Sequence, residues 1–247
     1  MTKARGVSVG GDRAVWCLDV NGRLHKWDGS RWRQNPTAVA VEVAVGSDDY
    51  VWCRNGSGGL FRAESADYDT GWRQLPDYPG DGLRSISANI EGELWIVNGA
   101  GDVWRLAGGH WSNPGGPRDG RFISTGSPGR VCYVSGSGML RVSGVDVGGL
   151  TWATIRRPVV NGAEVALKSV SYSLEGAIWA SDANDQLYKR GRTDATWRHN
   201  NNGAAVQVSV GPINEVWCVN AAGQIWRASH SLGFVNTYWH PMPQPGN

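Results

Sequence analysis

The chain has 247 residues, enough for one large domain with a sizeable core, and its 35 glycines and 14 tryptophans far exceed ordinary usage. Its 24 basic and 22 acidic side chains are scattered and nearly cancel, so the sequence lacks the basic stripe of a duplex-binding protein. Glycine follows no three-residue period, no apolar run approaches the length of a membrane span, and the long Ala-, Leu-, Glu- and Lys-rich stretches of helical folds are absent, which favours an all-β protein.

Residues 1–40 predict four short strands, at residues 7–9, 15–18 and 24–27 and from Trp32 onward. The pattern recurs down the chain, and its second strands carry Val15-Trp16, Val51-Trp52, Leu94-Trp95, Val131-Cys132, Ile178-Trp179 and Val216-Trp217. An apolar marker lies nine residues before the second member of each pair, at Val7, Val43, Ile86, Ile123, Val170 and Val208. Another lies eight residues after it, at Leu24, Leu60, Val103, Leu140, Leu187 and Ile225.

Six copies in 247 residues give about 41 residues each, within the ~40–45 residues of a four-stranded propeller blade. We therefore expect residues 1–247 to form a single all-β domain, a six-bladed β-propeller of four-stranded antiparallel blades. The repeats span approximately residues 5–38, 39–81, 82–119, 120–164, 165–205 and 206–240. The pattern leaves no strand to be exchanged between the first and last blades, so it does not show how the ring closes.

A turn between the second and third strands of each copy has its own chemistry. Asp, Asn or Ser suits the first position of such a turn, and Gly suits the fourth, where the backbone needs a positive φ. The first positions are Asp19, Asn55, Asn98, Ser135, Asp182 and Asn220, and the fourth are Gly22, Gly58, Gly101, Gly138, Asp185 and Gly223. We expect these residues to make turns only.

A later tryptophan closes every copy, including the fourth, which has Cys132 where the others have an earlier tryptophan. An indole offers an apolar face to a pyranose ring and an N–H to fix it, so these residues are candidates for sugar binding. The alternative is that they pack blade against blade. The six closing tryptophans are Trp32, Trp72, Trp111, Trp152, Trp197 and Trp239.

A basic residue follows the third-strand marker by two positions in five copies, at Lys26, Arg62, Arg105, Lys189 and Arg227. A long cation beside an aromatic ring can donate hydrogen bonds to sugar hydroxyls. The alternative is a stem packed on the blade with its charge in solvent. The fourth copy has Val142 there and Arg141 one position earlier, so its site should be weak or empty. One position before these cations lie further aromatic residues, either core or stacking surface: His25, Phe61, Trp104, Tyr188 and Trp226.

The cysteines and histidines favour neither a metal site nor catalysis. Cys17, Cys53 and Cys218 share one column of the repeat, and equivalent positions on neighbouring blades are too far apart for a disulfide. Buried free thiols are expected, as in a reducing cytosol. The five histidines fall in unrelated columns or tails, and no carboxylate pair recurs. We expect no enzyme activity, no cofactor and no metal.

The last copy carries Val208-Ser209-Val210-Gly211, Val216-Trp217-Cys218-Val219-Asn220, Gly223-Gln224-Ile225-Trp226-Arg227 and Trp239. These segments resemble the tectonin repeat, and the resemblance covers nearly the whole chain. A WD repeat would show Gly-His and Trp-Asp marks, and only Trp27-Asp28 occurs. The tectonin resemblance implies a sugar-binding protein of innate defence. Its partners would be glycans, either O-methylated sugars such as mannose or fucose, or bacterial surface polysaccharide.

The function expected from these observations is that of a lectin with several equivalent weak sites, made strong on glycan-coated surfaces by multivalency. The alternative is a protein-interaction scaffold that binds no sugar. Neither nucleic-acid binding nor membrane insertion is expected, and a homo-oligomer is compatible with the sequence. The N-terminus has no apolar segment typical of a secretory signal, and with the free cysteines this favours a cytoplasmic protein.

Overall fold

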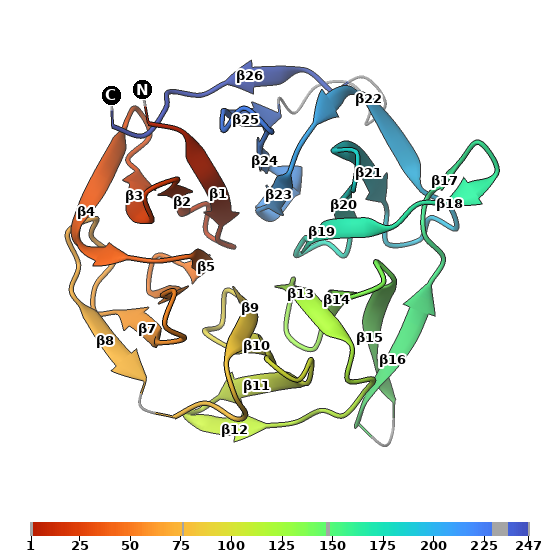
Figure 1. The fold of residues 1–247 in the computed structure, drawn as a ribbon, viewed down its shortest axis with the longest axis horizontal. Coiled ribbons are helices and arrows are strands. Elements are labelled where there is room, and N and C mark those ends of the chain that lie inside the picture. The colour runs from red at the N-terminus through yellow and green to blue at the C-terminus, as the bar shows by residue number, and fades with distance from the viewer. Residues whose placement is uncertain (1, 76, 147–148, 229–236, 247) are drawn as a thin grey trace.

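The computed structural model describes residues 2–75, 77–146, 149–228 and 237–246. These residues form six sheets of four antiparallel strands, arranged as the blades of a propeller around a central channel (Figure 1). The predicted fold, an all-β six-bladed propeller, is confirmed.

Each blade consists of four consecutive strands, and its first strand lies at the channel while its last strand lies at the rim (Figure 1). The first three blades are β1 (Ala4–Val9), β2 (Val15–Asp19), β3 (Arg23–Trp27), β4 (Trp32–Val39); β5 (Glu42–Ser47), β6 (Tyr50–Arg54), β7 (Leu60–Ala63), β8 (Trp72–Leu75); β9 (Leu83–Ala88), β10 (Leu94–Asn98), β11 (Val103–Ala107), β12 (His110–Ser112). The last three are β13 (Gly120–Thr125), β14 (Val131–Ser135), β15 (Leu140–Asp146), β16 (Gly149–Ile155); β19 (Leu167–Tyr172), β20 (Ile178–Asp182), β21 (Gln186–Arg190), β22 (Arg198–Ala204); β23 (Gln207–Val210), β24 (Val216–Val219), β25 (Ile225–Ala228), β26 (Trp239–Pro241).

Two small elements interrupt this order. A hairpin of β17 (Val159–Val160) and β18 (Ala163–Glu164) projects from the rim between the fourth and fifth blades (Figure 1). A short 3₁₀ helix, η1 (Pro212–Asn214), connects β23 to β24.

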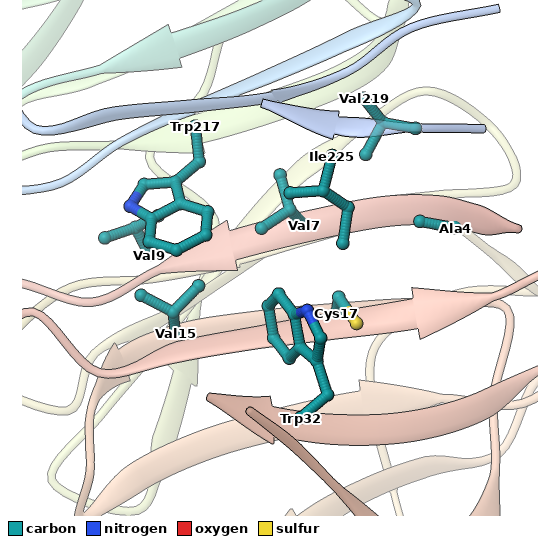
Figure 2. Packing of buried hydrophobic residues seen from close by; sticks show 9 residues of the cluster. All are labelled: Ala4, Val7, Val9, Val15, Cys17, Trp32, Trp217, Val219 and Ile225. Atoms are coloured by element: carbon teal, nitrogen blue, oxygen red, sulfur yellow. The ribbon is translucent and has the colours of Figure 1, made fainter. Parts of the chain in front are cut away.

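The core consists of six hydrophobic clusters, one at each blade junction. Each cluster joins the second-strand tryptophan of one blade, or Cys132 in the fourth, to apolar residues on the first two strands of the next. The cluster between the last and first blades is built in the same way and is shown in Figure 2. It contains Trp217, Val219 and Ile225 of the sixth blade and Ala4, Val7, Val9, Val15, Cys17 and Trp32 of the first. The ring therefore closes by burying apolar surface between blades, without an exchanged strand.

A ring of serine hydroxyls holds the inner strands together. At five junctions a serine one residue after the first-strand marker accepts a hydrogen bond from a backbone N–H of the next inner strand, at 2.9–3.0 Å. The bonds join Ser8 to Val45, Ser87 to Thr125, Ser124 to Tyr172, Ser171 to Val210 and Ser209 to Val9. The closing junction thus has the same bond as four of the five internal junctions.

The junction between the second and third blades is built differently, because Ala44 occupies the serine position. The side chain of Glu42 bonds the next blade there: Oε1 accepts the Ile86 N–H at 3.2 Å and the Ser85 hydroxyl at 2.8 Å, just as Gln207 Oε1 accepts the Val7 N–H at the closing junction. Arg54 Nε donates to Oε2 of the same carboxylate at 2.6 Å. A charged network therefore joins the second and third blades, while the serine hydroxyl of the other junctions is absent here.

The turns between second and third strands form as predicted. Their fourth residues all have a positive φ, between 66° and 91°, and only Asp185 is not a glycine. In the first turn Asp19 Oδ1 accepts the N–H groups of Asn21 and Arg23. In five blades the carbonyl of the positive-φ residue also accepts a backbone N–H from the start of the next blade; the last of these bonds joins Gly223 to Ala4 at 2.8 Å. The turns therefore bind neighbouring blades as well as reversing the chain.

Candidate functional site

The five predicted cations share one position in the blade. Strand pairing places each directly across from the second-strand tryptophan of its own blade. The pairs are Trp16 with Lys26, Trp52 with Arg62, Trp95 with Arg105, Trp179 with Lys189 and Trp217 with Arg227. Cross-strand neighbours in a sheet lie close enough for direct side-chain contact.

Four of these cations stack on the tryptophan opposite. The arginine Cζ or lysine Nζ lies 5.5 to 5.8 Å from the centroid of the indole ring in the pairs made by Arg62, Arg105, Lys189 and Arg227. Such cation–π contacts stabilise by roughly 0.5–1 kcal/mol at exposed positions. Lys26 instead reaches the second blade, where Nζ contacts Asp48 Oδ1 at 2.8 Å and the Ala66 carbonyl at 2.6 Å.

Acidic side chains pair with the cations of the third and sixth blades. Arg105 forms an ion pair with Glu93, and Arg227 Nη2 lies 2.9 Å from Glu215 Oε1. Glu215 also accepts the indole N–H of Trp217 at 3.1 Å. The two arginines nevertheless keep 38% and 40% of their side-chain surface exposed, so their outer edges can reach a ligand. Neither acid was expected from the sequence, although each lies two residues before a second-strand tryptophan.

The fourth blade lacks both members of this pair. Its register places Val142 across from Cys132, where the other five blades have a cation and a tryptophan. Arg141, one position earlier, lies across from Tyr133 and forms an ion pair with Asp119 at 3.2 Å. The cation and the tryptophan that face each other in the other blades are therefore both absent from the fourth blade.

The closing tryptophans also share one position: five of them lie across from the residue three positions after the third-strand marker, and Trp197 immediately precedes β22. In each, the indole N–H donates a hydrogen bond to the preceding blade or, for Trp32, to the C-terminal segment. The acceptors are the carbonyls of Pro243, Asp77, Gly115 and Arg156 for Trp32, Trp111, Trp152 and Trp197, and the Oδ1 atoms of Asn35 and Asn200 for Trp72 and Trp239. These N–H groups already have acceptors within the protein, so any role in sugar binding would fall to the ring faces.

One closing tryptophan differs from the other five in how much of its side chain is exposed to solvent. Trp32 is buried, with 5% of its surface exposed, between Trp27 and Trp217. The other five are half-buried. Trp72 and Trp239 pack edge-on against second-strand tryptophans of the preceding blades, Trp16 and Trp179, with ring centroids 6.1 and 6.5 Å apart.

The structure thus brings the two predicted columns together across a junction, not within one blade. A second-strand tryptophan pairs across the sheet with the cation of its own blade and packs in one cluster with the closing tryptophan of the next. We call this arrangement a junction set. Four junction sets combine a cation with a half-buried closing tryptophan: Lys26 with Trp72, Arg62 with Trp111, Arg105 with Trp152 and Lys189 with Trp239. The set at the fourth blade lacks the cation, and the set at the sixth has the buried Trp32.

A groove of about 440 Å³ lies beside Arg62. It is lined by Asp49, Arg62, Ala63, Glu64, Ser65 and Arg73. Arg62 Nη2 donates to the Asp49 carbonyl at 3.4 Å, and its guanidinium also lies 5.0 Å from the Tyr50 ring. The groove therefore offers both donors and acceptors, as the hydroxyls of a sugar require.

The aromatic residues beside the cations divide between core and surface. His25 and Tyr188 are buried, and each bonds the first residue of its turn: His25 Nε2 lies 3.2 Å from Asp19 Oδ2, and the Tyr188 hydroxyl donates to Asp182 Oδ2 at 3.1 Å. These two support the turn. Phe61, Trp104 and Trp226 are half-buried and pack against the junction clusters.

All four cysteines are buried free thiols. Burial raises the pKa of the Cys53 thiol to about 12 and shifts those of Cys17, Cys132 and Cys218 upward as well. Within the described part of the chain, no three His, Cys, Asp or Glu side chains lie close enough to hold a metal ion. No helix in that part is long and apolar enough to cross a membrane.

Comparison with known proteins supports the propeller fold and does not identify a function. No family model matches the chain, and no curated protein matches its sequence. Among solved structures, it is similar to a gluconolactonase from Xanthomonas campestris (TM-score 0.62, 15% identity, 98% of this chain and 86% of that one). It is also similar to the Neurospora crassa Pan2 WD40 domain (0.63, 13%, 99% and 80%) and to YCF48 bound to D1 peptide (0.59, 16%, 97% and 81%). At such identities the likeness shows the propeller fold alone.

Proposed function

We propose that this protein is a carbohydrate-binding lectin of the tectonin type, which binds glycans through its junction sets. The observation that carries the proposal is the repetition of one arrangement at four junctions, in which a half-buried closing indole and a cation are both neighbours of the same second-strand tryptophan. A sugar ring could lie with its C–H face on the closing tryptophan while the cation donates to its hydroxyls or ring oxygen. A methyl ether on the sugar would extend the apolar contact, which favours O-methylated glycans.

The proposed activity is binding without a chemical step. Each junction set offers a ligand one indole face and one cation, so single sites should be weak. Several sites on one rigid ring can engage a glycan-coated surface together, which raises avidity by about 10²–10⁴ without a new contact. The targets would be O-methylated mannose or fucose, or bacterial surface polysaccharide, met in innate defence by a cytoplasmic protein.

A glycan array that includes O-methylated mannose and fucose and bacterial polysaccharides tests the proposal. We expect binding to a related group of glycans, and competition by the corresponding free methylated monosaccharide at millimolar concentration. Failure to bind any glycan on the array would contradict the lectin and favour a protein-interaction scaffold.

A further inference from the structure

The starts of the inner strands carry a second repeated column, unconnected with the junction sets. Two residues before each first-strand marker the chain has Arg5, Val41, Arg84, Arg121, Lys168 and Val206. Four of the six are cations. Because β1 pairs with β2 so that Ala4 lies opposite Asp19, this end of the inner strands is on the face that carries the turns. The closing tryptophans begin the outer strands toward the opposite face.

Three of the four cations of this column, Arg84, Arg121 and Lys168, line a hollow at the mouth of the central channel. The hollow has a volume of about 600 Å³, and its charged lining residues are Arg54, Arg84, Arg121 and Lys168, from four successive blades. The sixth blade adds the amide of Gln207. Beneath the hollow the channel holds a cavity of about 240 Å³, which shares Arg54, Arg84 and Gln207 with it and is also lined by Arg5. We call the hollow the basic mouth.

Acidic residues compensate only part of this charge. Arg54 pairs with Glu42, and Lys168 pairs with Asp185. No carboxylate among the described residues pairs with Arg5, Arg84 or Arg121, and none lines the basic mouth itself. The chain as a whole carries a net charge of only +2, so the fold concentrates positive charge here from positions far apart in the sequence.

Two of the arginines are held in place by the backbone. Arg84 Nη1 donates to the Gly120 carbonyl at 3.0 Å, and Arg54 Nη2 donates to the Arg84 carbonyl at 2.8 Å. Each guanidinium has five N–H donors, so most remain available to a ligand. A concave, low-dielectric site lined by one sign of charge focuses the field and attracts counter-ions of the opposite sign.

We propose that the basic mouth binds a compact anion that bears several phosphate or carboxylate groups. Its volume lies within the ~300–1,000 Å³ of small-molecule sites, which suits a ligand of that size better than an extended polymer. Arginine presents its donors in a planar fork that matches phosphate and carboxylate oxygens. The site lies on the other face from the junction sets, and its function is independent of sugar binding.

Titration calorimetry with inorganic tripolyphosphate tests this site, and citrate serves as the carboxylate probe. The test variants are Arg121→Gln, which removes a guanidinium with no ion pair among the described residues, and the double variant Arg84→Gln/Arg121→Gln. The matched control is Arg31→Gln/Arg198→Gln, which removes the same charge from two exposed arginines outside the mouth. Thermal unfolding without ligand verifies that each variant is folded.

We expect tripolyphosphate to bind one site per chain, more tightly at low salt, and the double variant to weaken binding by about tenfold or more. The control should bind within about twofold of the wild type. Citrate binding that is lost in the same variants would extend the site to carboxylates, and binding of tripolyphosphate alone would restrict it to phosphates. Absence of binding at low salt, or equal weakening by the control, would overturn the proposal. Glycan binding by the double variant should be unchanged, so this outcome does not depend on the lectin function.

Discussion

Ser209 in the last blade accepts a hydrogen bond from the backbone N–H of Val9 in the first, with 3.0 Å between oxygen and nitrogen. The bond spans 200 residues of sequence and repeats the bonds at four internal junctions. The propeller is therefore closed by the same contacts that join its other blades. Removing this serine bond at any of the five junctions that have it should have a similar effect.

We expect Ser209→Ala to lower the free energy of unfolding by about 1–2 kcal/mol, because a buried N–H loses its acceptor. Ser124→Ala, at an internal junction, should cost a similar amount. Ala44→Ser should add the missing hydroxyl opposite the third blade and raise stability by up to about 1 kcal/mol. Urea unfolding of the three variants measures these differences. A loss in Ser209→Ala several times that in Ser124→Ala would show that the closing junction is not equivalent to the others.

A buried histidine should make stability depend on pH. Burial lowers the pKa of His25 below its ordinary value, while Asp19 opposes the shift. The unfolded chain then takes up a proton more readily than the folded one. The stabilisation is complete above about pH 6.5 and is lost as the pH falls toward the lower folded pKa, by up to about 1.4 kcal/mol per pH unit.

His25→Tyr tests this dependence with a substitution that the chain itself supplies, since Tyr188 makes the corresponding bond to Asp182 in the fifth blade. We expect the variant to lose less stability than the wild type between pH 7 and pH 5, measured by urea unfolding. Parallel pH profiles for the two proteins would show that His25 does not titrate in this range.

The four cysteines should resist thiol reagents in the folded protein. All are buried, and burial raises their pKa, so little reactive thiolate is present near neutral pH. We expect slow reaction of the native protein and rapid titration of four thiols after denaturation without reductant. Detection of fewer than four thiols would indicate a disulfide and would contradict the buried free thiols of the structure.

The sequence was sufficient to predict the propeller because its markers keep a constant spacing through six copies. Val7, Trp16 and Leu24 lie on three successive strands, and the hairpins that join those strands have constant length. Ring closure could not be predicted, because it depends on contacts between residues about 200 positions apart and on which serine oxygen faces which backbone N–H.

The sequence predicted which residues of the candidate site recur at equivalent positions in the blades, but it did not predict how they lie relative to one another. The sequence separates Lys189 and Trp239 by fifty residues, and only the structure places both on Trp179, one from its own blade and one from the next. The burial of Trp32 was also beyond sequence reasoning, because Trp27 and the C-terminal segment cover it. The cations two residues before the first-strand markers also recur with the repeat in the sequence. Only the folded ring shows that this end of each inner strand lies at the mouth of the channel.

The most direct test of the proposed junction sites counts bound sugars per chain by native mass spectrometry, with the methylated monosaccharide that the array identifies. Lys189 and Arg227 form a matched pair, because each stacks 5.5 Å from a second-strand tryptophan. The closing tryptophan beside Lys189 is the half-buried Trp239, whereas the one beside Arg227 is the buried Trp32. We expect Lys189→Gln to bind one sugar fewer than the wild type and Arg227→Gln to bind the same number. Equal counts and affinities in all three proteins would contradict sugar binding at the junction sets.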